Sequence, residues 1–285
     1  MAIACAYQNN RGTTPITRTL TLRRCNWDYA LYMSTESELQ DRIAVITGAS
    51  RGIGKAIALE LASAGATVAL VGRDEAKLTE TASEVHRLGS EASVFVTDVA
   101  QENDILALEH NIRSRFRGVD ILINNAGINT RKPLLEFTLD EWRNVLDTNL
   151  TSVFLMCRSI VPLMRGRKYG RIINLASTMS HVSLAGRSAY SASKAGILGL
   201  TRALALELAD HGITVVAISP GPFATELNTT LMTNAELNRQ IISKVPLAKW
   251  GEVRDIAKLT RFLCSPHASY ITGTDILIDG GWTAQ

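Results

Sequence analysis

The chain has 285 residues, of which 46% are hydrophobic and 20% are charged, so it can bury one sizeable core and holds at most two domains. No apolar run reaches the roughly 20 residues of a membrane-spanning helix, so we expect no membrane partner. The four cysteines lie far apart without a CxxC or Cys/His cluster, so the sequence predicts neither a metal site nor a disulfide framework and fits a reducing compartment.

The N-terminal segment accounts for the whole net charge of +3. Residues 1–32 contain four arginines and one aspartate, a difference of +3, so the remaining residues sum to zero and we expect no nucleic-acid binding. The segment lacks the apolar core of a secretory signal. We predict a disordered N-terminal extension over residues 1–41, in which Met33 would itself make an ordinary start. The predicted location is the cytoplasm; the alternative is organelle import through residues 1–32.

From residue 42 onward, short β-rich runs alternate with helix-length amphipathic stretches. Strands are predicted at 43–47, 66–71, 92–97, 120–123, 170–175, 213–218 and 275–279. Helices are predicted at 53–64, 74–88, 101–116, 140–165, 188–210, 228–244 and 252–264. Such alternation is typical of a parallel sheet with helices on both faces. Because no repeat or Pro/Gly linker divides residues 42–285, we predict a single α/β domain with a doubly wound sheet.

A glycine-rich turn joins the first predicted strand to the first helix, where residues 47–54 read TGASRGIG. Glycines there let the backbone approach a nucleotide pyrophosphate at the helix N-terminus. The spacing departs from GxGxxG, so a mere tight turn remains the alternative. The strand-turn-helix setting favours a cofactor loop, and hence a Rossmann-like dinucleotide-binding domain. The candidate cofactor-binding residues of this loop are Gly48, Ser50, Arg51, Gly52, Ile53 and Gly54.

The end of the second predicted strand bears on the choice of cofactor, because it should approach the adenosine ribose. An NAD site usually places an acid there, but this chain has Gly72 followed by Arg73. Arg73 and Arg51 would attract a 2′-phosphate through charge-assisted bonds, so the sequence favours NADP over NAD. The alternative is that both arginines are solvated loop residues, with Asp74 partly offsetting the charge of Arg73.

A tyrosine and a lysine lie four residues apart in the stretch AYSASKAG, residues 189–196. On a helix, Tyr190 and Lys194 would share one face, and the ammonium would favour the phenolate. Bringing a tyrosine pKa from about 10 to about 7 requires roughly 4 kcal/mol, more than one lysine is expected to supply. From these residues alone, an ordinary helix start with a half-exposed tyrosine remains the alternative.

Six elements together resemble the short-chain dehydrogenases/reductases, and residues 42–285 are identified as a member of that family. The elements are Thr47-Gly48 with Gly52 and Gly54, Asn124-Asn125-Ala126-Gly127, Asn149, Ser177, Tyr190 with Lys194, and Pro220-Gly221. The resemblance implies an enzyme that interconverts a ketone and a secondary alcohol by hydride transfer with an NADP cofactor. It makes the segment around Tyr190 the catalytic helix.

Four catalytic residues are implied by this resemblance: Asn149, Ser177, Tyr190 and Lys194. Tyr190 would be the general acid/base, and Ser177 would hydrogen-bond the substrate oxygen. Lys194 would hold the nicotinamide ribose and lower the pKa of Tyr190, while Asn149 resembles the position that anchors a water in the proton relay. The further cofactor-binding positions implied are Asp98, Val99, Asn125, Ala126, Gly127, Tyr190, Lys194, Pro220, Gly221 and Thr225.

The substrate is expected beneath a lid at about residues 223–249, where members of the family differ most. The apolar side chains that could line it are Phe223, Leu227, Leu231 and Met232, although an amphipathic surface helix would use the same residues. Polar and cationic residues near the chemistry are Asn129, Arg131, His181 and Arg187. These residues suit a small hydroxylated or carboxylated substrate. A lone histidine is more often a satisfied loop residue, so His181 is not predicted to be catalytic.

Two groups within the family compete for the substrate assignment. Residues 125–133 and 249–251 resemble gluconate 5-dehydrogenases, whereas residues 149–154 are equally similar to β-ketoacyl-ACP reductases. Those reductases dock an acidic carrier protein on arginines at positions that match Lys168 and His211, of which only Lys168 is charged. We therefore predict a sugar-acid substrate first and a β-ketoacyl-ACP substrate second. A non-catalytic NADP-binding regulatory protein is the alternative of another class.

The catalytic helix also predicts assembly, because it carries two apolar stripes. The first is Ile197, Leu200, Leu204 and Leu208, and the second is Leu198, Ala205 and Leu206. A helix with two buried faces often meets another subunit. The prediction is a homotetramer or homodimer; burial within one subunit is the alternative.

Overall fold

Seven parallel strands form one sheet in the computed structural model, which describes residues 38–284. The strands are β1 (Ile43–Thr47), β2 (Thr67–Gly72), β3 (Ala92–Val96), β4 (Ile121–Asn124), β5 (Gly170–Leu175), β6 (Ile213–Pro220) and β7 (Asp275–Ile278). Their order across the sheet is β3-β2-β1-β4-β5-β6-β7. The predicted doubly wound fold is therefore confirmed. Most of the predicted extension lies outside the described residues, and of its last four residues Leu39 is fully buried.

The direction of winding reverses at β1. This strand pairs in parallel with β2 on one side, where Val45 aligns with Ala69, and with β4 on the other, where Val45 aligns with Leu122. The chain first builds outward to β3 and then crosses back to β4 before continuing to β7. In open α/β sheets of this kind, ligands bind beyond the carboxyl ends of the strands at the reversal. The topology thus locates a site beside the turn after β1.

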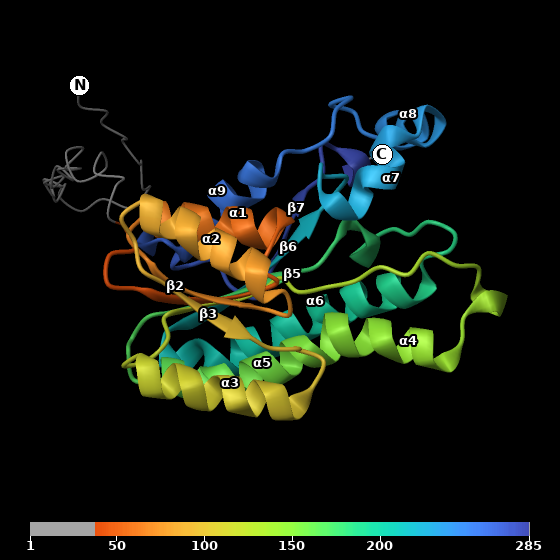
Figure 1. Cartoon of the computed structure of the whole chain (residues 1–285). Coiled ribbons are helices and arrows are strands. Elements are labelled where there is room, and N and C mark those ends of the chain that lie inside the picture. Colours follow the sequence, from red (N-terminus) through yellow and green to blue (C-terminus); the bar gives the residue numbers. More distant parts are fainter. Residues whose placement is uncertain (1–37, 285) are drawn as a thin grey trace, which may run out of the picture. The chain divides into compact units, whose positions relative to one another are not determined.

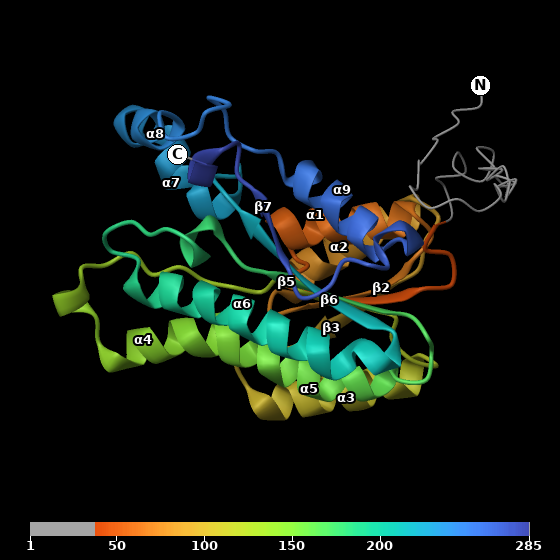
Figure 2. The ribbon, with the colours of Figure 1, turned by 180° about the vertical axis from the view of Figure 1, so that it is seen from behind.

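Helices cover both faces of the sheet, in two layers visible from either side (Figures 1 and 2). One layer holds α1 (Gly52–Ser63), α2 (Glu75–Arg87) and α9 (Val253–Cys264). The other holds α3 (Glu102–Arg115), α5 (Ser152–Met164) and α6 (Ser188–Leu208), with α4 (Leu139–Leu146) continuing beside α6. The amphipathic stretches of the sequence supply these helices, because each buries one apolar stripe against the strands.

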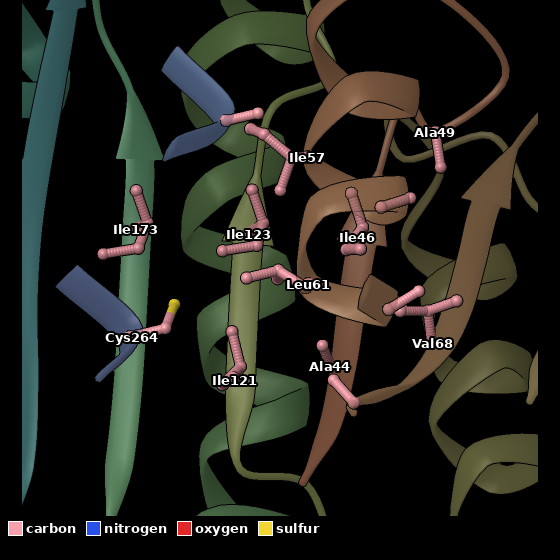
Figure 3. Close-up of a cluster of buried hydrophobic side chains, with 14 of the residues drawn as sticks. Ala44, Ile46, Ala49, Ile57, Leu61, Val68, Ile121, Ile123, Ile173 and Cys264 are labelled. Carbon is pink, nitrogen blue, oxygen red and sulfur yellow. The ribbon is translucent and has the colours of Figure 1, made fainter. Parts of the chain in front are cut away.

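Each face of the sheet has its own hydrophobic core. On the α1 side, Ile57 and Leu61 are fully buried against Ile123 and Ile46, and Cys264 closes the cluster from α9 (Figure 3). Burial of a side chain of this size contributes about 2 kcal/mol relative to exposure. Since both faces are covered, the strands read as continuous apolar runs rather than as an alternating pattern.

Two predicted helices are interrupted. The stretch predicted at 140–165 consists of α4, a π-helical turn (η3, Asp147–Thr151) and α5. The stretch predicted at 228–244 consists of α7 (Thr229–Thr233) and α8 (Ala235–Ile242), because the Asn234 side chain accepts hydrogen bonds from the N–H groups of Glu236 and Leu237 and starts a new helix. A short 3₁₀ turn, η6 (Glu226–Asn228), precedes them. None of the described helices is long and apolar enough to cross a membrane.

A charge cluster occupies the amino ends of the central strands. The Asp120 carboxylate is fully buried and accepts hydrogen bonds from the guanidinium groups of Arg42 and Arg167 and from the Ile43 N–H, all at 3.0–3.1 Å. The Arg42 guanidinium lies 3.8 Å from the centroid of the Tyr169 ring, and that of Arg171 lies 4.3 Å from it. Burial raises the pKa of the Tyr169 phenol, which donates to the carbonyl of Cys264.

Candidate active site

Two pockets open at the carboxyl ends of the strands. The larger has a volume of about 1060 Å³ and lies over the turn after β1. It is lined by twelve of the predicted cofactor-binding residues: Gly48, Ser50, Arg51, Gly52, Ile53, Arg73, Asp98, Val99, Asn125, Ala126, Gly127 and Thr225. The smaller has a volume of about 90 Å³ and is lined by Tyr190, Ser177 and Gly221. Of the other predicted cofactor residues, Gly54, Lys194 and Pro220 line neither pocket.

The glycine turn is built so that only glycine fits at two of its positions. Gly48 has a φ of +66°, and a Cβ there would lie 2.8 Å from the Asn125 amide nitrogen. A Cβ on Gly54 would lie 2.2 Å from the Gly48 carbonyl oxygen. Gly54 therefore acts from beneath the turn, by letting α1 approach it closely. The cradle that results fits a dinucleotide pyrophosphate at the N-terminus of α1.

Asn125 fastens this turn to the loop after β4. Its amide nitrogen donates to the carbonyls of Thr47 at 2.9 Å and Gly48 at 3.2 Å, and its backbone N–H donates to the Thr47 hydroxyl. The same hydroxyl accepts from the Ala126 N–H at 3.1 Å. Asn125 thus lines the cofactor pocket and also fixes its shape.

Both arginines predicted to select the cofactor lie on the wall of the larger pocket. Arg73 faces Asp98 at 3.7 Å, and Arg51 faces Glu226 at 3.2 Å. Asp74, which the alternative interpretation paired with Arg73, caps α2 by accepting a hydrogen bond from the Lys77 N–H, and the ion-pair partner of Arg73 is Asp98. The two guanidiniums are 60–69% exposed and each lies beside a partly exposed carboxylate, so they can reach an anion bound in the pocket.

Ser177 and Tyr190 meet in the smaller pocket. Ser177 follows β5 and is 7% exposed, and its hydroxyl accepts a hydrogen bond from the Met179 N–H at 3.1 Å. Tyr190 lies in the first turn of α6. Burial raises the pKa of the Tyr190 phenol, while its hydrogen bond with Ser177 and the charges of Arg187 and Arg131 act in the opposite direction. The pair can therefore hold a carbonyl oxygen between two hydroxyl groups.

Lys194 is buried behind this pair. Its amino group donates to the Leu175 carbonyl at 2.6 Å and lies 5.8 Å from the centroid of the Tyr190 ring. Desolvation lowers the pKa of Lys194 to about 8. The expected lowering of the Tyr190 pKa by Lys194 is not seen, since the charges that lower it belong to Arg187 and Arg131.

Asn149 lies in the π-helical turn and is fully buried. Its amide oxygen accepts from the Ile128 N–H at 2.8 Å, and its amide nitrogen donates to the Ile128 carbonyl and the Ser193 hydroxyl. The π turn adds a residue to the helix at the place where this side chain must reach both the loop after β4 and α6. Asn149 is thus a positioning residue, and its anchoring of a water stays a prediction.

The polar residues expected near the chemistry divide into two groups. Asn129, Arg131 and Arg187 line the smaller pocket, whereas His181 pairs with Asp275 of β7 and does not line it. Of the apolar lid candidates, Leu231 lines this pocket. Phe223 is instead buried in the core, and Met232 does not line either pocket.

Several pocket residues were not identified from the sequence. In the larger pocket these are Glu75, Thr97, Ile128, Thr148 and Glu226. In the smaller they are Thr178, Met179, Leu184, Pro222, Asn228, Ile241, Trp250 and Trp282. Most of them are next to a predicted site residue in the sequence, and this proximity could have been used to identify them. Trp250 and Trp282 carry no such local signal, because the folding of the C-terminal region brings them to Tyr190.

Comparisons with known proteins agree with this geometry. Residues 48–283 match the family model described as Enoyl-(Acyl carrier protein) reductase. The 3-oxoacyl-[acyl-carrier-protein] reductase FabG of Haemophilus influenzae is 40% identical over 243 residues, which cover 85% of this chain and 98% of that protein. The FabG of Staphylococcus aureus strain Mu50 is also 40% identical, over 240 residues that cover 84% and 96%.

Two similar solved structures are named for gluconate rather than for a 3-oxoacyl substrate. A putative NAD(P) dependent gluconate 5-dehydrogenase from Beutenbergia cavernae with bound NADP has a TM-score of 0.84 and 38% identity, covering 88% of this chain and 100% of that one. A gluconate 5-dehydrogenase from Burkholderia cenocepacia in complex with NADP and tartrate has a TM-score of 0.84 and 33% identity, covering 88% and 98%.

Proposed function

Since this chain belongs to the short-chain dehydrogenase/reductase family of oxidoreductases, we propose that it interconverts a keto group and a secondary alcohol on a small sugar acid, with NADP as cofactor. The observation that carries the proposal is the convergence of Ser177 and Tyr190 in a pocket that also contains Arg131 and Arg187. The Burkholderia relative named for gluconate holds tartrate, itself a hydroxylated acid.

The larger pocket supports NADP. Because Gly54 has no side chain, the N-terminus of α1 packs closely against Gly48, and the turn above it forms a cradle that suits a pyrophosphate. Arg51 and Arg73 would hold the 2′-phosphate, and Lys194 would reach the nicotinamide ribose. When bound, NADP supplies or accepts the hydride at its nicotinamide ring.

The residues of the smaller pocket handle the oxygen and its proton. In the reducing direction, the Tyr190 hydroxyl donates its proton to the oxygen that was the carbonyl. The Ser177 hydroxyl donates a hydrogen bond to the same oxygen and stabilises negative charge as it develops there. In the oxidising direction, the Tyr190 phenolate accepts the alcohol proton. Asn149 holds the Ile128 backbone in place, and thereby one wall of the site.

Reduction of a β-ketoacyl thioester on a carrier protein is the second candidate. It is favoured by the 40% identity to two FabG proteins. The candidate docking residues, Lys168 and His211, directly precede the amino ends of β5 and β6, whereas Ser177 follows the carboxyl end of β5. Within one subunit the docking residues and the chemistry are thus at opposite ends of the sheet, which makes a sugar acid the better supported substrate.

Assembly into a homotetramer or homodimer and a cytoplasmic location are part of the same proposal. Leu206 on α6 is 83% exposed and Phe154 on α5 is 47% exposed, on helices whose opposite faces are buried against the sheet. A second copy of the chain would cover them.

The test is oxidation of NADPH and NADH by the purified full-length chain, followed at 340 nm with 5-ketogluconate and with acetoacetyl thioester. The proposal expects turnover of the keto acid with NADPH. Turnover of the thioester alone would establish the reductase alternative. NADPH binding without turnover of any carbonyl would instead support the non-catalytic regulator.

A further inference from the structure

Arg187 places a cation without a counter-ion beside the catalytic tyrosine. It precedes α6 by one residue and lines the pocket that contains Tyr190. Within residues 38–284 its guanidinium makes neither a hydrogen bond nor an ion pair. Burial, and then the nearby charge of Arg131, lowers the pKa of Arg187 to about 10. A partly buried charge held in this way costs free energy unless a ligand neutralises it.

A second arginine, Arg131, adds positive charge to the same pocket. Arg131 comes from the loop after β4, and among the described residues its guanidinium donates a hydrogen bond to the Asn228 amide oxygen at 3.0 Å. An amide is a neutral acceptor and Arg131 is exposed, so solvent rather than a described carboxylate offsets the charge of Arg131. The described residues that line this pocket include no aspartate or glutamate. The two guanidiniums thus line the smaller pocket, in which none of the described lining residues is an anion.

Asn129 adds an acceptor to these donors. It lines the same pocket, and its amide oxygen is buried without a hydrogen-bond partner among the described residues. An unsatisfied buried acceptor destabilises the protein unless a donor reaches it. A hydroxyl group of a bound substrate would supply the missing donor. Cations and an acceptor together match a molecule that carries both an acid and hydroxyl groups.

We propose that Arg187 and Arg131 form a carboxylate-binding subsite beside Tyr190, with Asn129 accepting a hydrogen bond from a neighbouring hydroxyl of the substrate. The inference rests on the proposed function and deepens it, because it assigns recognition of the acid group to named residues. A guanidinium binds a carboxylate through two parallel N–H donors, so the subsite also fixes the orientation of the keto group relative to Tyr190.

The test compares 5-ketogluconate with L-sorbose, which differs only in carrying a CH₂OH group where the acid has its carboxylate. With the full chain and NADPH, kcat/KM for the keto acid should exceed that for L-sorbose by about 10- to 100-fold, the usual worth of a hydrogen bond to a charged group. Arg187→Met should bring this ratio close to 1 through loss of turnover of the acid, and Arg187→Lys should restore part of it. Arg131→Met should lower the ratio by a smaller factor.

Arg117→Met is the matched control, because Arg117 is exposed and lies before the amino end of β4, away from the site. Its ratio should equal that of the wild type. A wild-type ratio near 1, or an unchanged ratio in Arg187→Met, overturns the subsite while leaving the oxidoreductase intact. A preference for dihydroxyacetone phosphate over the keto acid would reassign the arginines to a phosphate and also overturn it.

A binding measurement separates this inference from the proposed function. In calorimetry with NADPH present, which cannot accept a hydride from an alcohol, D-gluconate should bind at least about tenfold more tightly than D-glucitol, and Arg187→Met should remove the difference. Equal binding of the two polyols overturns the subsite whatever the enzyme turns over. Failure to reduce any ketone, with gluconate still preferred, refutes the proposed function alone.

Discussion

Among the described residues, buried charge is paired with opposite charge at the amino ends of the strands and is not paired at the carboxyl ends. At the amino ends, the Asp120 carboxylate is surrounded by two guanidiniums and a backbone N–H within the protein itself. At the carboxyl ends, Arg187 lacks an anion among the described residues, and the Lys194 amino group has a carbonyl as its partner. The central strands between them are mostly apolar and are covered on both faces.

This difference separates charges that hold the fold from charges that recognise a ligand. Removal of a buried carboxylate or of one of its partners destabilises the native state, because the remaining groups are left uncompensated. A buried cation without an anion destabilises the protein slightly and binds a suitable ligand more tightly. Substitutions at the amino ends should therefore change stability, and those at the carboxyl ends should change activity.

The largest effect is expected at Tyr190. Tyr190→Phe removes the proton donor and keeps the ring, so kcat should fall about 10³- to 10⁴-fold while the melting temperature and NADPH binding stay unchanged. The measurement is NADPH oxidation with the keto acid. Tyr270→Phe is the matched control, because Tyr270 is fully exposed and should tolerate the change. More than a tenth of wild-type activity in Tyr190→Phe would contradict the assigned role.

The reverse pattern is expected at Asp120. Asp120→Ala leaves Arg42, Arg167 and the Ile43 N–H without their acceptor, and should lower the free energy of unfolding by about 3 to 4 kcal/mol. Urea unfolding measures the loss, and kcat per folded molecule should not change. Asp140→Ala is the control, since its side chain is 95% exposed and its removal should cost less than about 0.5 kcal/mol. An Asp120→Ala enzyme that is stable but inactive would reverse the comparison.

Lys194 should make stability depend on pH. Its pKa is lowered to about 8 by burial, so between about pH 8 and pH 10.5 the unfolded chain keeps a proton that the folded chain has lost. The free energy of unfolding should therefore rise with pH across this window, by up to about 3 kcal/mol in the difference between wild type and Lys194→Met.

Urea titrations of both proteins from pH 7 to pH 10 measure this difference. The same comparison with Lys258→Met, a substitution of an exposed lysine on α9, should give a flat difference. A difference that falls as the pH rises would mean that the native state favours the charged form of Lys194.

The smallest effect is expected at Arg73, which is 69% exposed. Arg73→Ala should lower the preference for NADPH over NADH by about 2 kcal/mol, or about 30-fold in the ratio of kcat/KM values, because one charge-assisted contact with the 2′-phosphate is lost. Arg87→Ala, on the exposed end of α2, should leave the ratio unchanged. An unchanged ratio in Arg73→Ala would assign cofactor choice to Arg51 alone.

The sequence supported some inferences far better than others. All seven strands were predicted, because each is a short apolar run that must be covered on both faces. The break of the 140–165 helix at Asn149 was not predicted, since it depends on hydrogen bonds to Ile128 and Ser193, which are 21 and 44 residues away. The hydrogen bond from the Lys194 amino group to the Leu175 carbonyl was not predicted either, because i,i+4 spacing within a helix says nothing of a contact with β5.

The sequence by itself determined the alternation of strands and helices and the position of the glycine turn. These are local properties, set by periodicity and by the backbone freedom of glycine. Only the tertiary structure decided which charges have partners. Asp120 and Arg187 look alike along the chain, as single charged residues near a strand or a helix end. Their roles differ because charge pairing depends on distances in space, and the fold surrounds Asp120 with arginines while it leaves Arg187 facing a pocket.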